Sequence, residues 1–175
     1  MKIKKKGVLL MEEIKDNIVH DAFYLISLFN ENDENVTQLQ VQKIMYFIEA
    51  YWMAMHDDED FLYKCNFNAW AFGPVAIPLY DEFKVYGENP IILNEEQKDI
   101  GNGITEEKKK IIRYIYSVFG KLSAMDLVKL THRRDSPWYE KWEENGNRVV
   151  FGARSYIDKA KTKEWFKKVF LNGTK

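Results

Sequence analysis

The segment His132-Arg133-Arg134-Asp135 combines the residue types that acid–base and phosphate chemistry use. A histidine can act as a general base when a carboxylate orients it, and guanidinium groups bind phosphate oxygens in pairs. This pattern would suit a phosphoryl- or nucleotide-handling enzyme. However, the sequence has no nucleophile elbow, P-loop, HExxH motif or glycine-rich phosphate loop to complete such a site. Because the helix dipole also favours a histidine at a helix C-terminus, we expect His132 to be structural and not catalytic.

A second cluster, residues 56–60 (His-Asp-Asp-Glu-Asp), joins one imidazole to four carboxylates. Consecutive residues point in different directions, and the spacing fits no metal-ligand pattern, so an acidic surface loop is the better interpretation. The single cysteine, Cys65, can form no intramolecular disulfide and belongs to no zinc-binding motif. We therefore expect no catalytic residue, no metal and no cofactor, and a reducing, cytoplasmic location.

Aromatic residues crowd the stretch from Ala69 to Gly87, AWAFGPVAIPLYDEFKVYG. Residues 67–72 alternate with the period of two that is typical of a strand. Gly73-Pro74 is expected to end this strand, since proline has no N–H for a ladder and glycine permits a sharp turn. Pro78 then suits the first turn of a short helix that carries Tyr80. The predicted unit is a strand, a turn and a short helix.

Four rings could either fill the core or anchor a partner: Trp70, Phe72, Trp138 and Trp142. Burial in the core is the default for any one of them. Tryptophan, tyrosine and arginine nevertheless dominate the energetic hot spots of protein interfaces, and here they lie beside proline-containing turns. Both interpretations stay open, and direct contact with a partner is considered for Trp70, Phe72, Arg133 and Trp138.

The composition indicates one globular domain. The chain has 175 residues, 46% of them hydrophobic and 15% aromatic, which is enough for one core. A net charge of -1 argues against a dedicated nucleic-acid-binding protein, so DNA is not an expected partner. No apolar run reaches the roughly 20 residues that a membrane-spanning helix needs. The start, MKIKKKGVLLM, is too short in apolar residues for a secretion signal and predicts a basic arm at residues 1–10.

The remaining apolar periodicities predict a mainly α-helical domain at residues 11–175, with about six helices and a small β element near residues 61–72. Expected helices cover residues 14–29, 37–55, 78–86 and 105–119, the stretch from 123 to before 137, and a last one from about 155; a brief helix is expected near 95. The helix that begins with the Thr37 to Gln40 capping box is expected at the buried centre. Trp138 and Trp142 are placed on a turn, because Pro137 should stop the preceding helix. Residues 122–131 also resemble the first helix of a helix-turn-helix, but Pro137 argues against a second one.

Three blocks in order resemble the Panacea domain, the SocA-like family of bacterial and phage antitoxins. The first is TQLQVQKIMYFIEAY at residues 37–51, the second is the aromatic stretch at 69–87, and the third is LSAMDLVKLTHRRDSPW at 122–138. In the third block Arg133-Arg134-Asp135-Ser136 departs from the family pattern, which has an acidic residue soon after the histidine. The resemblance spans about residues 11 to 170.

The resemblance implies a non-enzymatic antitoxin that binds and neutralises a cognate protein toxin encoded by the adjacent gene. An alternative within the family is an adaptor that delivers the toxin to an ATP-dependent protease; a phosphoryl-handling enzyme and a DNA-binding autoregulator are alternatives of other classes. The partner-binding surface is predicted to involve Trp70, Phe72, Pro74, Tyr80, His132, Arg133 and Trp138. The identity of the toxin, a cellular or prophage origin, and self-association stay open.

Overall fold

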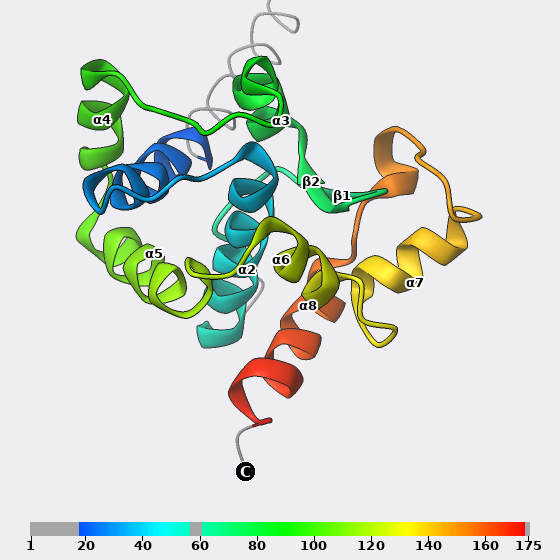
Figure 1. Cartoon of the computed structure of the whole chain (residues 1–175). Coiled ribbons are helices and arrows are strands. Elements are labelled where there is room, and N and C mark those ends of the chain that lie inside the picture. The colour runs from blue at the N-terminus through cyan, green and yellow to red at the C-terminus, as the bar shows by residue number, and fades with distance from the viewer. Residues whose placement is uncertain (1–17, 57–60, 174–175) are drawn as a thin grey trace, which may run out of the picture.

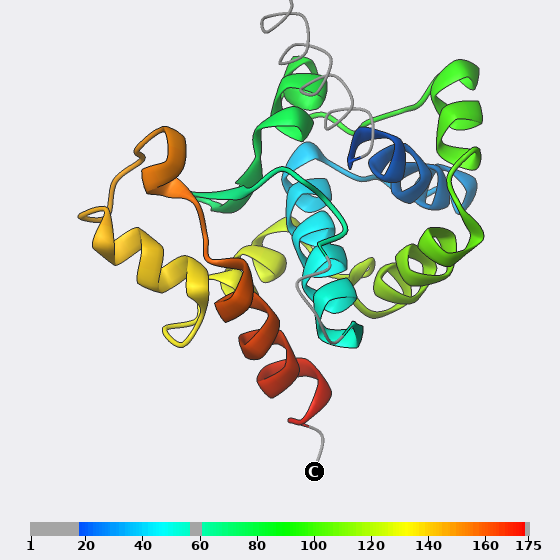
Figure 2. The same ribbon diagram turned by 180° about the vertical axis from the view of Figure 1, so that it is seen from behind.

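Helix α2 (Gln38–Met55) runs through the middle of the computed structural model, which describes residues 18–56 and 61–173. A helix at residues 18–31, α4 (Glu95–Asn102) and α5 (Glu106–Phe119) lie on one side of it, and α7 (Pro137–Glu144) lies on the other (Figure 1). The view from behind shows α8 (Lys159–Phe166) running along α2 (Figure 2). The other elements are β1 (Phe67–Trp70), β2 (Gly73–Ala76), α3 (Ile77–Phe83), α6 (Ala124–Thr131), the short 3-10 turns η1 (Lys84–Tyr86) and η2 (Gly152–Ser155), and the π-helical turn η3 (Lys167–Leu171).

The predicted central helix is confirmed. Every residue from 41 to 50 is buried, because α3, α5, α6, α8 and strand β2 all pack against α2. Its start is fixed by the side-chain oxygen of Gln40, which accepts a hydrogen bond from the Thr37 N–H at 3.0 Å. Aromatic rings supply much of the core around it: Phe47 stacks on Phe119 with ring centroids 4.5 Å apart.

A two-stranded antiparallel hairpin supplies the small β element, which confirms its presence but corrects its extent. β1 pairs with β2 from Phe67↔Ala76 to Trp70↔Gly73, and residues 61–66, which precede β1, are irregular. Gly73-Pro74 was expected to end the strand, but these residues begin the second strand after a turn at residues 71–72. Gly73 has φ +100°, which only glycine adopts readily.

The outer edge of β2 explains how a proline fits into a strand. Side chains of α2 take the place of a third strand there: the Gln42 amide accepts from the Ala76 N–H at 2.8 Å and donates to the Ala76 carbonyl at 3.1 Å. The next residue of α2 is Lys43, whose side-chain nitrogen Nζ donates to the Pro74 carbonyl at 2.8 Å. Because side chains and not a third strand cover this edge, no ladder hydrogen bond requires the backbone N–H that Pro74 lacks.

Two helical predictions need correction. Pro137 does not prevent a helix but begins α7, at a first-turn position where no N–H donor is required. The Ser136 hydroxyl accepts from the Tyr139 N–H at 3.1 Å and caps that helix. Trp138 and Trp142 therefore lie on a helix and not on a turn. The last helix begins later than expected, at Lys159, after the Asp158 carboxylate caps it.

The helices predicted at 37–55, 78–86 and 105–119 agree with the structure, and the brief helix predicted near residue 95 is α4. The helix predicted at 14–29 is confirmed from residue 18 onward, and its first positions lie outside the described residues. The helix predicted from residue 123 is α6, which ends at Thr131.

The predicted basic arm at residues 1–10 lies outside the described residues, as do positions 57–60 of the acidic cluster. The division into this arm and a domain from residue 11 stays a prediction. Within the described ranges, no helix combines the length and apolar character needed to cross a membrane.

Candidate partner-binding site

An apolar groove opens where the hairpin, α3 and the first turns of α2 and α6 meet. It has a volume of about 520 Å³. Its apolar lining comes from segments far apart in the chain: Leu39, Trp70, Phe72, Tyr80, Met125 and Val149. Among the described lining residues, Glu88 alone carries a charge. We call this surface the hairpin groove.

Several rings and side chains of the hairpin groove are open to solvent. Phe72 at the hairpin turn is 60% exposed and Met125 on α6 is 51% exposed. Trp70 is half-buried and packs edge-on against Tyr80 at 5.1 Å, while Phe151, 77% exposed, approaches Trp70 from the other side at 6.3 Å. Exposed apolar side chains gathered along a groove are typical of a surface that another protein covers.

Of the predicted site residues, the structure places three in the lining of the hairpin groove and the others outside it. Trp70, Phe72 and Tyr80 all line the hairpin groove. Pro74 is buried in β2. Trp138 is only 3% exposed, so in this conformation it offers no surface to a partner.

Trp138 instead contacts the backbone of a residue that lines the groove. Its indole N–H donates to the backbone carbonyl of Trp70 at 3.0 Å, which ties α7 to the end of β1. Its other neighbours are rings: His132 stacks on it at 3.7 Å with an angle of 3°, and Trp142 stacks at 5.5 Å. The stacked rings hold Trp138 in place, and its hydrogen bond fixes the backbone that presents Trp70.

The arrangement around His132 does not form an acid–base site. Asp135 accepts two hydrogen bonds from the exposed Arg133 guanidinium, at 3.0 and 3.1 Å, and so it is paired with that residue and not with the imidazole. Burial, with a smaller contribution from the charge of Lys43, lowers the pKa of His132 to about 4. The imidazole is therefore neutral at pH 7 and a weak base.

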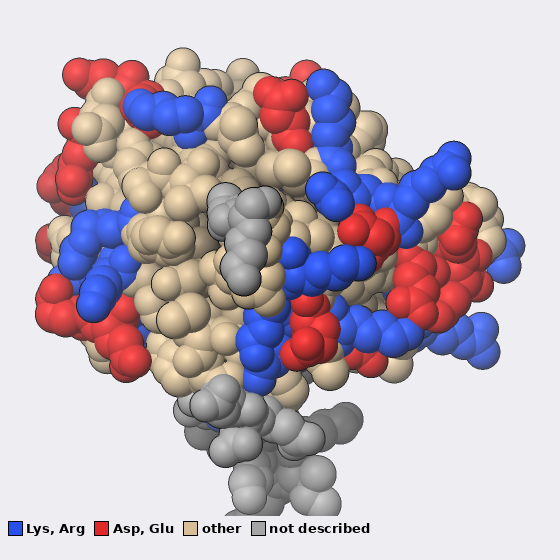
Figure 3. Space-filling view, turned by 90° about the horizontal axis from the view of Figure 1, so that it is seen from below, with Lys and Arg blue, Asp and Glu red and all other residues tan. Residues whose placement is uncertain are grey.

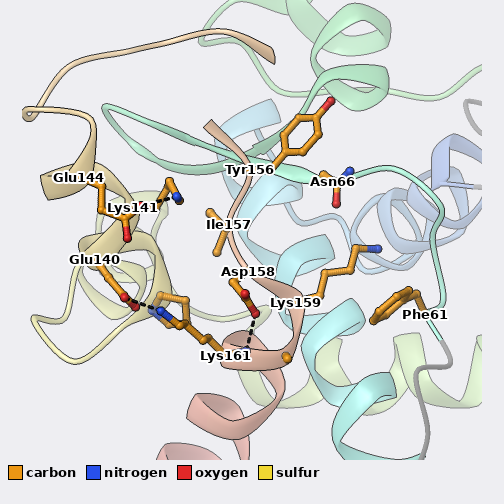
Figure 4. Close-up of a pocket in the computed structure, with 12 residues that line it drawn as sticks. Phe61, Asn66, Glu140, Lys141, Glu144, Tyr156, Ile157, Asp158, Lys159 and Lys161 are labelled. Carbon is orange, nitrogen blue, oxygen red and sulfur yellow. Dashed lines mark hydrogen bonds and ion pairs between the residues drawn. The ribbon is translucent and has the colours of Figure 1, made fainter. Parts of the chain in front are cut away.

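A second cavity, of about 590 Å³, lies between α7 and the start of α8 (Figure 4). Its charged side chains are already paired with one another or with the backbone: Lys161 with Glu140, Lys141 with Glu144, and the Asp158 carboxylate with the Lys161 N–H (Figure 4). Lys159 bonds Glu49 at 3.0 Å and the Tyr63 carbonyl at 2.6 Å. Each described lysine that lines this cavity is thus already paired with a carboxylate, and Asp158 caps α8.

The described residues also give no support to a metal site or a reactive cysteine. No group of three His, Cys, Asp or Glu side chains within them could hold a metal ion. Burial raises the pKa of Cys65 to about 12, so this thiol is unreactive at neutral pH. His56, the described residue of the acidic cluster, stacks on Trp52 at 4.0 Å.

The charge distribution also disfavours a nucleic-acid interface. On the face seen from below, positive and negative side chains are interleaved and form no continuous positive field (Figure 3). A helix does follow α6, contrary to our expectation, but its exposed side carries Glu140, Glu143 and Glu144. With two of these carboxylates paired to lysines and Glu143 unpaired among the described residues, this helix does not present the positive surface with which a recognition helix meets the phosphate backbone.

Sequence reasoning missed three of the large apolar side chains that line the groove. Leu39, Met125 and Val149 come from three separate segments, and each looks locally like an ordinary apolar residue. The sequence does contain one indication that Met125 is exposed. It lies in the first turn of α6, and the positions that this helix buries are 127, 128 and 131.

Comparison with known proteins places these features in a family context. The model of a family described as "Antitoxin SocA-like, Panacea domain" matches residues 41–139, a segment that contains the hairpin, α3 and α6. Antitoxin SocA of Caulobacter vibrioides (strain NA1000 / CB15N) is 28% identical over 148 residues, which cover 80% of this chain and 78% of that protein. No solved structure matches the chain.

Proposed function

Because this chain belongs to the SocA-like, Panacea-domain family of antitoxins, we propose that it neutralises a protein toxin by binding it in the hairpin groove. The observation that carries this proposal is the gathering of Trp70, Phe72 and Tyr80 with Met125 on one exposed apolar surface. The protein acts by association and not by catalysis. Its partner is the cognate toxin, encoded by the adjacent gene and present in the same cytoplasm.

The hairpin groove has the composition that tight protein interfaces share. Its lining holds aromatic side chains and a methionine, which bury a large apolar area on contact. It also offers polar groups that can bond a partner, including Thr37, Gln38 and Glu88. A mainly apolar lining with a few polar groups favours a folded protein surface over a small charged ligand.

The hairpin is held in place before a partner arrives. Gln42 and Lys43 close one edge of it, and Trp138 holds the carbonyl at its tip. On the other edge, the Ile157 N–H donates to the Phe67 carbonyl at 2.9 Å. Association then requires little further ordering of the chain, which strengthens binding.

Co-expression with the neighbouring reading frame tests this proposal. The neighbour alone should stop growth, and this chain should restore growth and co-purify with it. Phe72→Asp and Met125→Asp should abolish both effects, since a carboxylate in the groove centre would be buried without a partner. Ile92→Asp is the matched control, because Ile92 is 64% exposed but lies outside the groove.

The same cells distinguish direct neutralisation from delivery to a protease. Direct binding predicts that the toxin persists at an unchanged level in rescued cells. An adaptor that hands the toxin to an ATP-dependent protease would instead make the toxin disappear, and rescue would require that protease. A pulse-chase of labelled toxin separates the two mechanisms.

A further inference from the structure

Lys43 is buried completely in the middle of α2. Its side-chain nitrogen Nζ donates one hydrogen bond, to the Pro74 carbonyl at 2.8 Å. No described carboxylate pairs with it, although a protonated lysine carries three N–H donors and a full charge. A buried charge without a counter-ion is strongly disfavoured, so this position favours the uncharged amine.

The groups that enclose Lys43 belong to the hairpin and to α6. A Cβ atom placed on Gly73 would lie 2.7 Å from both the Lys43 Cε and the Thr131 hydroxyl, so β2, α6 and this side chain are in close contact. The titratable group that faces Lys43 from α6 is His132. β2 contributes only Gly73 and Pro74 here, and α2 itself contributes the buried Tyr46, whose hydroxyl bonds Thr162 at 3.1 Å.

We propose that Lys43 is a proton-dependent latch on the hairpin. The uncharged amine holds Pro74 against α2 and so keeps the turn that carries Phe72 in place. Protonation drives the side chain toward water, which breaks its bond to Pro74 and displaces Gly73 and Pro74, the β2 residues in contact with it. Partner binding in the hairpin groove then weakens in acidic solution; this consequence rests on the proposed function, whereas the movement of the hairpin does not.

The position of the titration supports this latch. Burial lowers the pKa of Lys43 to about 7, within the range that cells experience. His132, whose pKa is about 4, stays neutral over the same range and neither compensates for the charge nor adds to it. The Gln42 amide bonds to Ala76 do not titrate. We therefore expect the movement to be confined to the tip of the hairpin.

An NMR titration of the full chain, free of any partner, tests the latch. The indole N–H signals of Trp70 and Trp138 report on the tip of the hairpin and are assigned with Trp70→Phe and Trp138→Phe. In the wild type they should shift with a midpoint near pH 7, and in Lys43→Met they should not shift. The variant with His20→Gln and His56→Gln removes the two other histidines of the chain, and it should keep the transition.

Three results would overturn the latch: no transition in the wild type, a transition that persists in Lys43→Met, or one that vanishes with the two histidines. If Lys43→Met fails to fold, the ¹⁵Nζ signal of Lys43 in the wild type decides the question. A midpoint near pH 7 supports the latch, and one above about pH 9, closer to an ordinary lysine, contradicts it.

Toxin affinity gives a separate readout. If only the uncharged form binds, wild-type affinity should fall about tenfold between about pH 8 and pH 6, and Lys43→Met should show no change. Indole signals that titrate in a protein that binds no toxin would support the latch and refute the proposed function. Toxin binding without any indole transition would support the proposed function and refute the latch.

Discussion

The indole N–H of Trp138 donates to the backbone carbonyl of Trp70 across 3.0 Å. This bond links α7, near the end of the segment that matches the family, to the hairpin near the middle of that segment. Trp138 therefore helps to position the groove through this bond, although it is buried and does not line the groove. The groove is therefore a composite of distant parts of the chain, held in register by a few buried polar contacts.

Trp138→Phe should lower the free energy of unfolding by about 1–3 kcal/mol, because the Trp70 carbonyl loses its partner while most of the ring remains. Affinity for the partner should weaken as well, since the backbone of Trp70 is less firmly placed. Urea unfolding and a binding titration measure the two effects. Trp142→Phe is the control, because the Trp142 indole N–H donates to no described residue.

Gly73→Ala should destabilise the protein by about 2–4 kcal/mol. The residue has φ +100°, and its new methyl group would lie 2.7 Å from Lys43 and Thr131. Gly87→Ala is the matched control: Gly87 also has a positive φ, of +56°, but a Cβ there meets nothing within 4 Å. Thermal unfolding should show the Gly73 variant as clearly less stable than the Gly87 variant, and equal stability would contradict the close packing described.

Stability should rise with pH between about 7 and 8.5. The pKa of Lys43 is lowered from 10.5 to about 7 in the folded protein, so over this range the unfolded chain binds more protons than the folded one. The free energy of unfolding therefore increases with pH, by about 1.5–2 kcal/mol over the interval. Urea unfolding at several pH values measures this slope.

Lys43→Met supplies the comparison, since methionine fills the site without a charge. It should remove the slope and be more stable than the wild type at pH 7. Near the upper end of this interval, at about pH 8.5, the thiol of Cys65 also titrates in the unfolded chain. Because burial raises the pKa of that thiol in the folded state, its contribution has the opposite sign. If Lys43→Met keeps the same dependence of the unfolding free energy on pH, that dependence comes from groups other than Lys43.

His132→Phe should leave neutralisation intact. The phenyl ring preserves the stack on Trp138 and removes an imidazole nitrogen, Nε2, that is buried without a hydrogen-bond partner among the described residues. Stability should therefore be equal or slightly greater. Growth rescue by this variant is the measurement, and loss of rescue in a folded variant would revive the phosphoryl-handling alternative.

The parts of the fold that could be predicted are those with local causes. The apolar period of α2 and its capping box lie within a few residues of each other, so the sequence alone reveals that helix. α5 and α6 likewise begin at Thr105 and Ser123, whose hydroxyls cap them in the structure. Such signals require no knowledge of the rest of the molecule.

The parts that could not be predicted depend on distant partners. Gly73-Pro74 looks like the end of a strand until Gln42 and Lys43, some thirty residues earlier, replace the missing strand partner. Pro137 is compatible both with the end of one helix and with the start of another, and only the Ser136 cap decides. His132 and Asp135 are neighbours in sequence, yet the pairing of Arg133 with Asp135 leaves the imidazole without a carboxylate.

Binding of the adjacent gene's product to purified wild-type, Phe72→Asp and Ile92→Asp proteins is the most direct test of the hairpin groove. We predict that Phe72→Asp weakens the complex by at least about 30-fold, the loss of one interface hot spot, while Ile92→Asp binds like the wild type. All three proteins should unfold at similar temperatures, because both positions are exposed. Equal affinity of Phe72→Asp and the wild type would contradict the account and place the toxin on another surface.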